Sequence, residues 1–135
     1  MADSIGPKTR ADWGHIAPQE PQRRRLIRRA RRLAESLADH LYAEFGADEV
    51  YCFGSLTDDH GERFTETSDI DIAVKGLPAR ERFEAEAEIE LDVIEPNEEF
   101  REFSFDLVRA EELDAPWSET RHAREAVEIP KPGRG

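Results

Sequence analysis

Cysteine is nearly absent from this chain of 135 residues, in which Cys52 is the single one. One cysteine excludes an internal disulfide and a cysteine-based zinc site, which is typical of proteins in a reducing compartment. Long apolar runs are missing too: no stretch reaches the ~18 residues of a membrane span, and Met1 to Trp13 hold no apolar segment that could serve as a signal peptide. We therefore expect a cytoplasmic protein in which Cys52 is a buried strand residue.

Basic residues are scarce outside one segment. The chain holds 31 acidic and 19 basic residues, for a formal net charge of -12. Seven of the basic residues are arginines between Arg23 and Arg32, which leaves 12 basic against 31 acidic residues elsewhere, a balance of -19. An acidic body repels nucleic-acid phosphates, so we expect no DNA or RNA binding except through this arginine cluster, and any bound nucleotide will need cations. The arginine cluster is either a solvated helix face that offsets the acidic body or a contact surface for an acidic partner or RNA.

The chain has the length of one domain. We expect a loosely ordered N-terminal arm over residues 1–17, one domain over residues 18–129 and a C-terminal tail over residues 130–135. Trp13 and Trp117 are expected to be packing anchors for the arm and for the C-terminal helix. A histidine metal site is not expected, because the four histidines lie in separate elements without ligand spacing; they are His15, His40, His60 and His122.

Apolar spacing predicts the first half of the fold. Apolar residues recur at three- and four-residue steps, which predicts a long amphipathic helix from about Pro21 to Phe45 that ends at Gly46. A strand over residues 49–53 follows, and then an exposed polar loop over residues 56–68.

The second half alternates between strands and helices. The predicted elements are a strand over residues 69–74, an acidic helix over 79–94, a strand over 103–108, a short helix over 118–126 and a final strand over 127–129. The buried side of the acidic helix would include Phe83, Ala87, Leu91 and Ile94. This order predicts an α/β fold with a small mixed sheet flanked by helices.

The strand over residues 69–74 carries two acids on one face, because Asp69 and Asp71 alternate with apolar residues. Their Cα atoms lie roughly 7 Å apart by strand rise, so their oxygens can converge on two metal ions held about 3.5 to 4 Å apart. Oxygen ligands favour Mg²⁺ or Mn²⁺ over zinc. The strand therefore predicts a site for two such ions.

Asp106 supplies a third carboxylate from inside the apolar strand over residues 103–108, where a charge is costly without a cation. There it would hold the metal that activates an attacking hydroxyl and could accept its proton. Asp92 competes for this role if residues 89–94 form a strand. We favour Asp106, because Pro96 and the acidic run before it fit a helix better.

Gly54-Ser55 leaves the strand over residues 49–53 and precedes the two acids. Glycine lets backbone amides approach phosphate oxygens without a Cβ in the way, and the serine hydroxyl can donate to a phosphate of a triphosphate tail. Each part is weak alone, since Asp69 and Asp71 can also be the solvent-facing half of an edge strand and Gly-Ser a common turn. Their combination in this strand and turn context favours nucleotidyl transfer.

Three segments closely resemble the DNA polymerase beta-type nucleotidyltransferase superfamily: Phe53-Gly54-Ser55, Ser68-Asp69-Ile70-Asp71-Ile72-Ala73-Val74 and Phe105-Asp106-Leu107-Val108. Within it, the chain looks like the minimal nucleotidyltransferases. Two further stretches are similar to ones common in that group, Gly76-Leu77-Pro78 before the acidic helix and the closing Arg124-Glu125-Ala126-Val127. The resemblance covers roughly residues 25–129.

The resemblance implies a polymerase beta-like nucleotidyltransferase fold and assigns roles to the motif residues. Asp69 and Asp71 would bind two Mg²⁺ ions, Asp106 the catalytic one of them, and Gly54 and Ser55 the triphosphate of the donor, ATP. Minimal members are commonly antitoxins partnered with HEPN-type toxin proteins, and some neutralise the partner by adenylylating a tyrosine. The resemblance thus implies an antitoxin that transfers AMP from ATP to a hydroxyl of such a partner.

Two other functions stay open. The same site could modify a small molecule such as an aminoglycoside, although one small domain leaves little to bind it. Alternatively, the chain is a non-enzymatic binding module that masks a partner protein, with the aspartates as an ATP-sensing or structural cluster. Substitution of Asp69 and Asp71 by asparagine separates masking from catalysis, because neutralisation of the partner by masking survives that change and neutralisation by catalysis does not.

Overall fold

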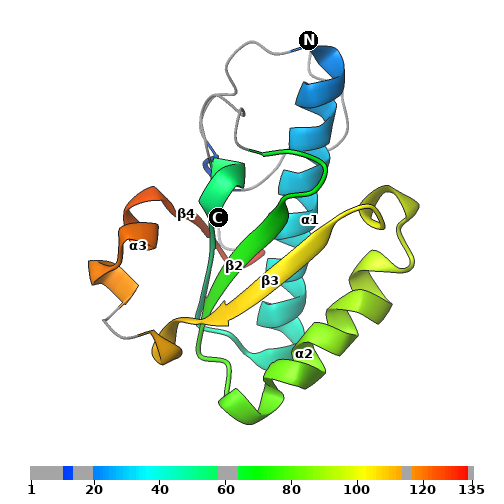
Figure 1. Cartoon of the computed structure of the whole chain (residues 1–135). Coiled ribbons are helices and arrows are strands. Elements are labelled where there is room, and N and C mark those ends of the chain that lie inside the picture. Colours follow the sequence, from blue (N-terminus) through cyan, green and yellow to red (C-terminus); the bar gives the residue numbers. More distant parts are fainter. Residues whose placement is uncertain (1–10, 14–19, 58–63, 114–116, 134–135) are drawn as a thin grey trace.

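The computed structural model describes residues 11–13, 20–57, 64–113 and 117–133. Within them lie four strands: β1 (Glu49–Phe53), β2 (Asp69–Lys75), β3 (Ser104–Arg109) and β4 (Val127–Ile129). They form one sheet in the order β3-β2-β1-β4, in which β2 runs parallel to β3 and antiparallel to β1, and β4 runs antiparallel to β1 (Figure 1). The expected α/β fold with a small mixed sheet is confirmed, and the predicted strand over residues 103–108 is shifted by one residue.

Helix α1 (Pro21–Phe45) has the predicted bounds. It begins with proline, whose missing amide hydrogen costs nothing in a first turn, and ends at Gly46, whose φ of 66° lets its amide donate to the Leu41 carbonyl. Its apolar residues join the main core cluster together with those of β1 and β2. In the described part of the chain, no helix combines the length and the apolar character that crossing a membrane requires.

The predicted helix over residues 79–94 is present in three parts: a 3-10 turn (Ala79–Glu81), α2 (Arg82–Glu88) and a π-helical segment (Ile89–Ile94). Its predicted buried side is wrong except at Ile94. Phe83 is 76% exposed, Leu91 is 66% exposed and Ala87 is also exposed, whereas the buried residues are Ala85, Ile89, Val93 and Ile94. Both sides of the helix are apolar, and the inner side offers the core three β-branched residues, whose branched side chains fill the space against α1.

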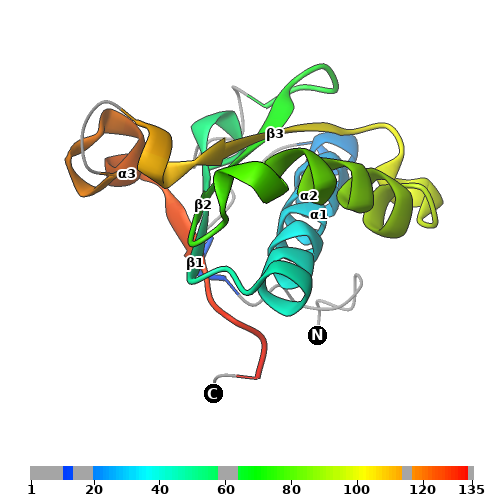
Figure 2. The same ribbon diagram turned by 90° about the horizontal axis from the view of Figure 1, so that it is seen from below.

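The two faces of the sheet are covered differently (Figure 2). Helices α1 and α2 pack on one face, where their apolar residues form a single cluster with those of the strands. On the other face, Trp117 begins a 3-10 turn (Trp117–Glu119) that leads to α3 (Arg121–Glu125), so the predicted helix over residues 118–126 is divided. The Trp117 ring lies 5.9 Å from the Phe53 ring and covers Ala73, whereas Asp69 at the other end of β2 is exposed.

Residues 11–13 of the expected arm pack against α1. The Ala11 amide and Trp13 Nε1 both donate to Glu35 Oε2, each at 2.8 Å. Trp13 and Trp117 are buried packing anchors, and Cys52 is a buried strand residue, as the sequence predicted. Residues 1–10, 14–17 and 134–135 of the expected arm and tail lie outside the described residues.

The predicted loop over residues 56–68 is not exposed at Leu56 or Phe64, which are fully buried. Leu56 belongs to a 3-10 turn (Gly54–Thr57) that directly follows β1. The Phe64 ring lies 6.3 Å from the Phe103 ring, so it fills the core beside the amino ends of β2 and β3. Residues 58–63 lie outside the described part of the chain.

Candidate functional site

The three predicted acids lie on neighbouring strands. Asp71 of β2 is paired with Asp106 of β3 in a parallel register. Residues paired in this way project to the same face of a sheet, and so do Asp69 and Asp71, which are two residues apart. Because the intervening Ile70 packs in the cluster under α1, the three carboxylates share the opposite face of the sheet.

This face is open at the acids and covered beyond them. The next pair along the strands, Ala73 and Val108, belongs to the apolar cluster under Trp117. Asp69 and Asp106 are exposed, and Asp71 is half-buried. The expectation that the charge of Asp106 sits among apolar groups is wrong, because Asp106 is exposed and its neighbours along β3, Phe105 and Leu107, point to the other face.

Gly54 lies directly against the Asp71 carboxylate. The residue before it, Phe53, is paired with Asp71 in the antiparallel register of β1 and β2. Gly54 has a φ of 83°, and a Cβ placed on it would overlap Asp71 Oδ2 and lie 3.3 Å from Asp71 Cγ. Both the left-handed backbone and the close approach restrict this position to glycine. The fold therefore brings the predicted turn and the second acid of β2 together.

Hydrogen bonds stabilise the turn after Gly54. Thr57 Oγ1 donates to the Gly54 carbonyl at 2.7 Å, and the half-buried Ser55 lies between these residues. Arg31 of α1 donates from Nη2 to the Leu56 carbonyl at 3.3 Å. The site's turn is thus connected to the helix on the far side of the sheet.

Arg31 is a positioning residue that the sequence reasoning missed. It was included in the arginine cluster as a surface residue, but it is 4% exposed, and its guanidinium lies 5.2 Å from the Trp13 ring. The available signal was its spacing, four residues after Ile27 and three before Ala34, which places it in the apolar stripe of α1.

Ser104 is a second residue that the sequence reasoning missed. Its hydroxyl donates to Asp69 Oδ1, and the two residues are paired in register. The available signal was its place two residues before Asp106, which puts both on one face of β3. The hydrogen bond orients the Asp69 carboxylate toward β3.

The three aspartates are not the most closely spaced set of possible metal ligands. Among the described residues, the only three metal-ligating side chains with ligand atoms within 4.8 Å of one another are His40, Glu88 and Asp92. Asp69, Asp71 and Asp106 are farther apart, as expected for three like charges on one face. Their donor set still fits Mg²⁺, because it consists of carboxylate oxygens on an open surface.

The spacing of the histidines in the sequence did not predict the group of His40, Glu88 and Asp92, because its members come from separate helices. His40 of α1 has its Nε2 3.0 Å from Glu88 Oε1, and this hydrogen bond by itself accounts for their closeness. Asp92 lies in the π-helical segment and not in a strand, so its alternative role as the third carboxylate of the sheet is wrong. His15 and His60 lie outside the described residues.

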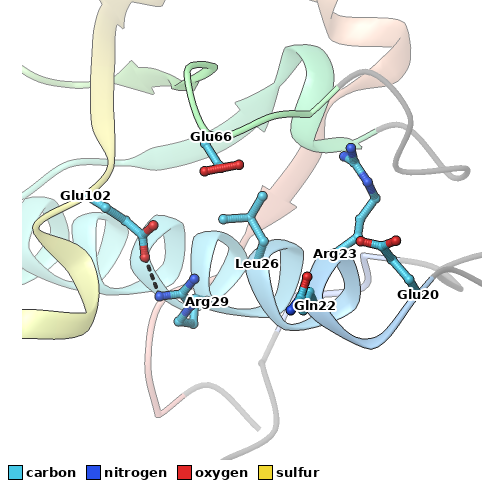
Figure 3. A pocket seen from close by; sticks show the side chains of 7 residues that line it. All are labelled: Glu20, Gln22, Arg23, Leu26, Arg29, Glu66 and Glu102. Carbon is cyan, nitrogen blue, oxygen red and sulfur yellow. Dashed lines mark hydrogen bonds and ion pairs between the residues drawn. The ribbon is translucent and has the colours of Figure 1, made fainter.

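Some side chains of the arginine cluster bind other segments of the same chain (Figure 3). Arg23 donates to the Phe64 carbonyl at 2.6 Å, and Arg29 pairs with Glu102. Arg23 and Arg29 line a hollow of about 250 Å³ between α1, Glu66 and Glu102. These contacts fasten α1 to the segments that lead into β2 and β3, which favours neither of the two interpretations of the cluster over the other.

Cys52 lies next to the site but is not a nucleophile. Burial raises the pKa of its thiol well above the ordinary value, the Asp71 carboxylate adds to that effect, and the Arg31 guanidinium opposes it. The thiol therefore stays protonated at neutral pH, and the thiolate is the reactive form.

The chemistry of the open face is that of carboxylate oxygens beside a glycine turn, an arrangement able to hold hard cations and the phosphates that accompany them. No protein-family model, curated protein or solved structure with which the chain was compared matches it.

Proposed function

We propose that this chain is a Mg²⁺-dependent nucleotidyltransferase, which moves a nucleoside monophosphate from a nucleoside triphosphate to a hydroxyl group and releases pyrophosphate. The observation that carries the proposal is the position of Gly54 against Asp71, with Asp106 beside it on the uncovered end of one sheet face. A glycine next to paired carboxylates leaves room for a metal-bound polyphosphate. An ordinary solvent-facing strand does not require a glycine at this position.

The residues of the site would divide between metal binding and triphosphate binding. Asp69, Asp71 and Asp106 would hold two Mg²⁺ ions, and Gly54 and Ser55 would hold the triphosphate. Bound Mg²⁺ would neutralise the phosphates and favour the ionised form of the attacking hydroxyl. The Asp106 carboxylate would accept the proton of that hydroxyl, since it is the exposed acid on the strand farthest from the turn.

The acceptor in this proposal is a hydroxyl of a partner protein, with AMP transferred from ATP to a HEPN-type toxin. Asp69 and Asp106 are exposed, so a side chain on the surface of another protein can approach them. The polymerase beta-like nucleotidyltransferase fold belongs to the same proposal. It is supported by the order of the strands and by the place of the motif on them.

Intact-mass spectrometry tests the proposal. The protein encoded beside this chain is incubated with it, Mg²⁺ and each nucleoside triphosphate in turn. We expect a mass increase of one or more nucleoside monophosphates, which is lost with Asp69→Asn and Asp71→Asn and retained with Asp12→Asn, which changes an exposed aspartate outside the sheet. An unchanged mass in a mixture that still forms a complex contradicts the transferase.

The second candidate is a binding module that masks its partner without chemistry. Two observations favour it: the three carboxylates do not converge, and α2 and the π-helical segment each expose one large apolar side chain, Phe83 and Leu91. For this function, Asp69→Asn and Asp71→Asn leave neutralisation of the partner intact.

A further inference from the structure

The helix formed by α2 and the π-helical segment is apolar on two opposite sides. Its inner side contributes Ala85, Ile89 and Val93 to the core. Phe83, Ala87 and Leu91 precede these residues by two positions each, which rotates them by about 200° around the helix. We call these three residues the outer stripe.

The outer stripe is exposed in the described structure. Phe83 and Leu91 are the two exposed large hydrophobic residues of the described chain, at 76% and 66%. They are separated by eight residues, or roughly 12 Å along the helix axis, with exposed Ala87 between them. Single exposed apolar residues are ordinary, but an ordered stripe at helical spacing opposite a filled core face indicates a contact surface.

Acidic residues border the outer stripe on both sides. Glu84, Glu88 and Asp92 follow one border at four-residue spacing, and Glu86 and Glu90 follow Arg82 on the other. Glu88 is engaged by His40 and Glu86 by Arg82, while Glu84, Glu90 and Asp92 are exposed. The stripe is therefore an apolar strip with a negative rim.

The negative rim restricts what can cover the stripe. Anionic membranes attract helices with basic borders, so this helix is unsuited to a lipid surface. A two-fold contact with a second copy would bring the same acidic borders together and cost repulsion. A complementary occupant carries an apolar strip flanked by lysine or arginine.

We propose that the outer stripe is the docking surface for a basic amphipathic helix of a partner protein. The stripe belongs to a helix at the periphery of the fold (Figure 1), and its side chains are exposed. Helix-on-helix packing matches such a narrow strip better than a flat surface does. Apolar contacts at Phe83 and Leu91 supply the affinity, and the rim carboxylates select basic partners. The proposal does not depend on the transferase activity, since it uses none of the site's residues.

The test measures binding of a defined probe to the whole chain by fluorescence anisotropy at about 0.15 M salt, where weak surface attraction is screened. The probe is a helical peptide of about 18 residues with a leucine stripe and lysine borders. Its controls are a peptide with glutamate in place of lysine, and one with the same charge but serine in place of leucine.

We expect saturable binding of the leucine-lysine peptide alone. The double variant Phe83→Ser/Leu91→Ser should weaken it at least tenfold, and Glu84→Gln/Glu90→Gln should weaken it and flatten its salt dependence. The matched control Ala43→Ser changes an exposed alanine of α1 and should leave binding unchanged. Equal urea midpoints would establish that the variants are folded.

Four results would overturn the proposal. Binding of the leucine-lysine peptide that survives Phe83→Ser/Leu91→Ser would place its site elsewhere. Equal binding of the serine-lysine peptide, or no binding of either, would exclude an apolar docking strip for basic helices. Light scattering that reveals a dimer abolished by the same double variant would assign the stripe to a second copy of the chain.

Discussion

Gly54→Ala is the change that tests the site most directly. A Cβ at this position would overlap Asp71 Oδ2, and the φ of 83° is one that residues with a Cβ rarely adopt. The left-handed backbone costs about 1–2 kcal/mol, and displacement of the Asp71 side chain adds about 1–3 kcal/mol, the usual range for overpacking. We expect the free energy of unfolding to fall by about 2–5 kcal/mol, as measured by urea denaturation followed by circular dichroism.

Gly46→Ala is the matched control for that change. Gly46 also has a positive φ, 66°, but a Cβ there meets nothing within 4 Å. Only the backbone cost remains, so this variant should lose about 1–2 kcal/mol. If Gly54→Ala costs no more than Gly46→Ala, the close approach of Gly54 to Asp71 is refuted.

A double-mutant cycle isolates the contact itself. Asp71→Ala removes Oδ2 and Cγ, and leaves only the Asp71 Cβ, 3.6 Å from the position of the added Cβ, which is an ordinary contact. In that background Gly54→Ala should cost as little as Gly46→Ala does. A coupling near zero between the two substitutions would contradict the reasoning.

Three further predictions follow from the packing and the protonation of the fold. Glu35→Ala should lower the free energy of unfolding by about 1–3 kcal/mol, since it leaves the buried Trp13 indole N–H without its acceptor; urea denaturation followed by tryptophan fluorescence measures this loss. Ile89→Ala should cost about 2–5 kcal/mol and Leu91→Ala within about 0.5 kcal/mol, which urea denaturation of both variants will compare. The free energy of unfolding should fall above pH 9.0, the ordinary pKa of a thiol, because burial raises the pKa of Cys52 and only the unfolded chain then releases the thiol proton. Below that pH the protonated thiol makes its full contribution to stability. Above it the loss, measured by urea titrations, approaches ~1.4 kcal/mol per pH unit.

Each of these predictions has an outcome that contradicts it. Equal losses at Ile89 and Leu91 would mean that the helix does not present the face described here. A pH dependence between 8 and 10 that is the same in Cys52→Ala would assign the alkaline loss to other groups. An unchanged urea midpoint in Glu35→Ala would show that Trp13 is not held by that carboxylate.

Local patterns in the sequence predicted most elements of this fold. The bounds of α1 follow from its apolar periodicity and from Gly46, since both act within a few residues. The alternation in residues 69–74 likewise puts Asp69 and Asp71 on one face, whichever strands pair with this segment. Strand period and helix period are properties of the backbone, so a sequence reveals them without tertiary contacts.

Contacts between distant segments decided the rest. A helix with two apolar sides has no local preference for either, and only packing against α1 turned Ile89 inward and left Phe83 exposed. The parallel register, which the sequence does not specify, put Asp106 beside Asp71 and in solvent.

The sequence by itself therefore determined α1, the strands to within a residue, and the acids and glycine of the candidate site. The tertiary structure alone decided which helix face is buried, that Arg31 supports the turn after Gly54, and that Ser104 binds Asp69. The physical reason is the range of the interactions: backbone periods act over a few residues, whereas burial and pairing join residues 25 and 35 positions apart in these two contacts.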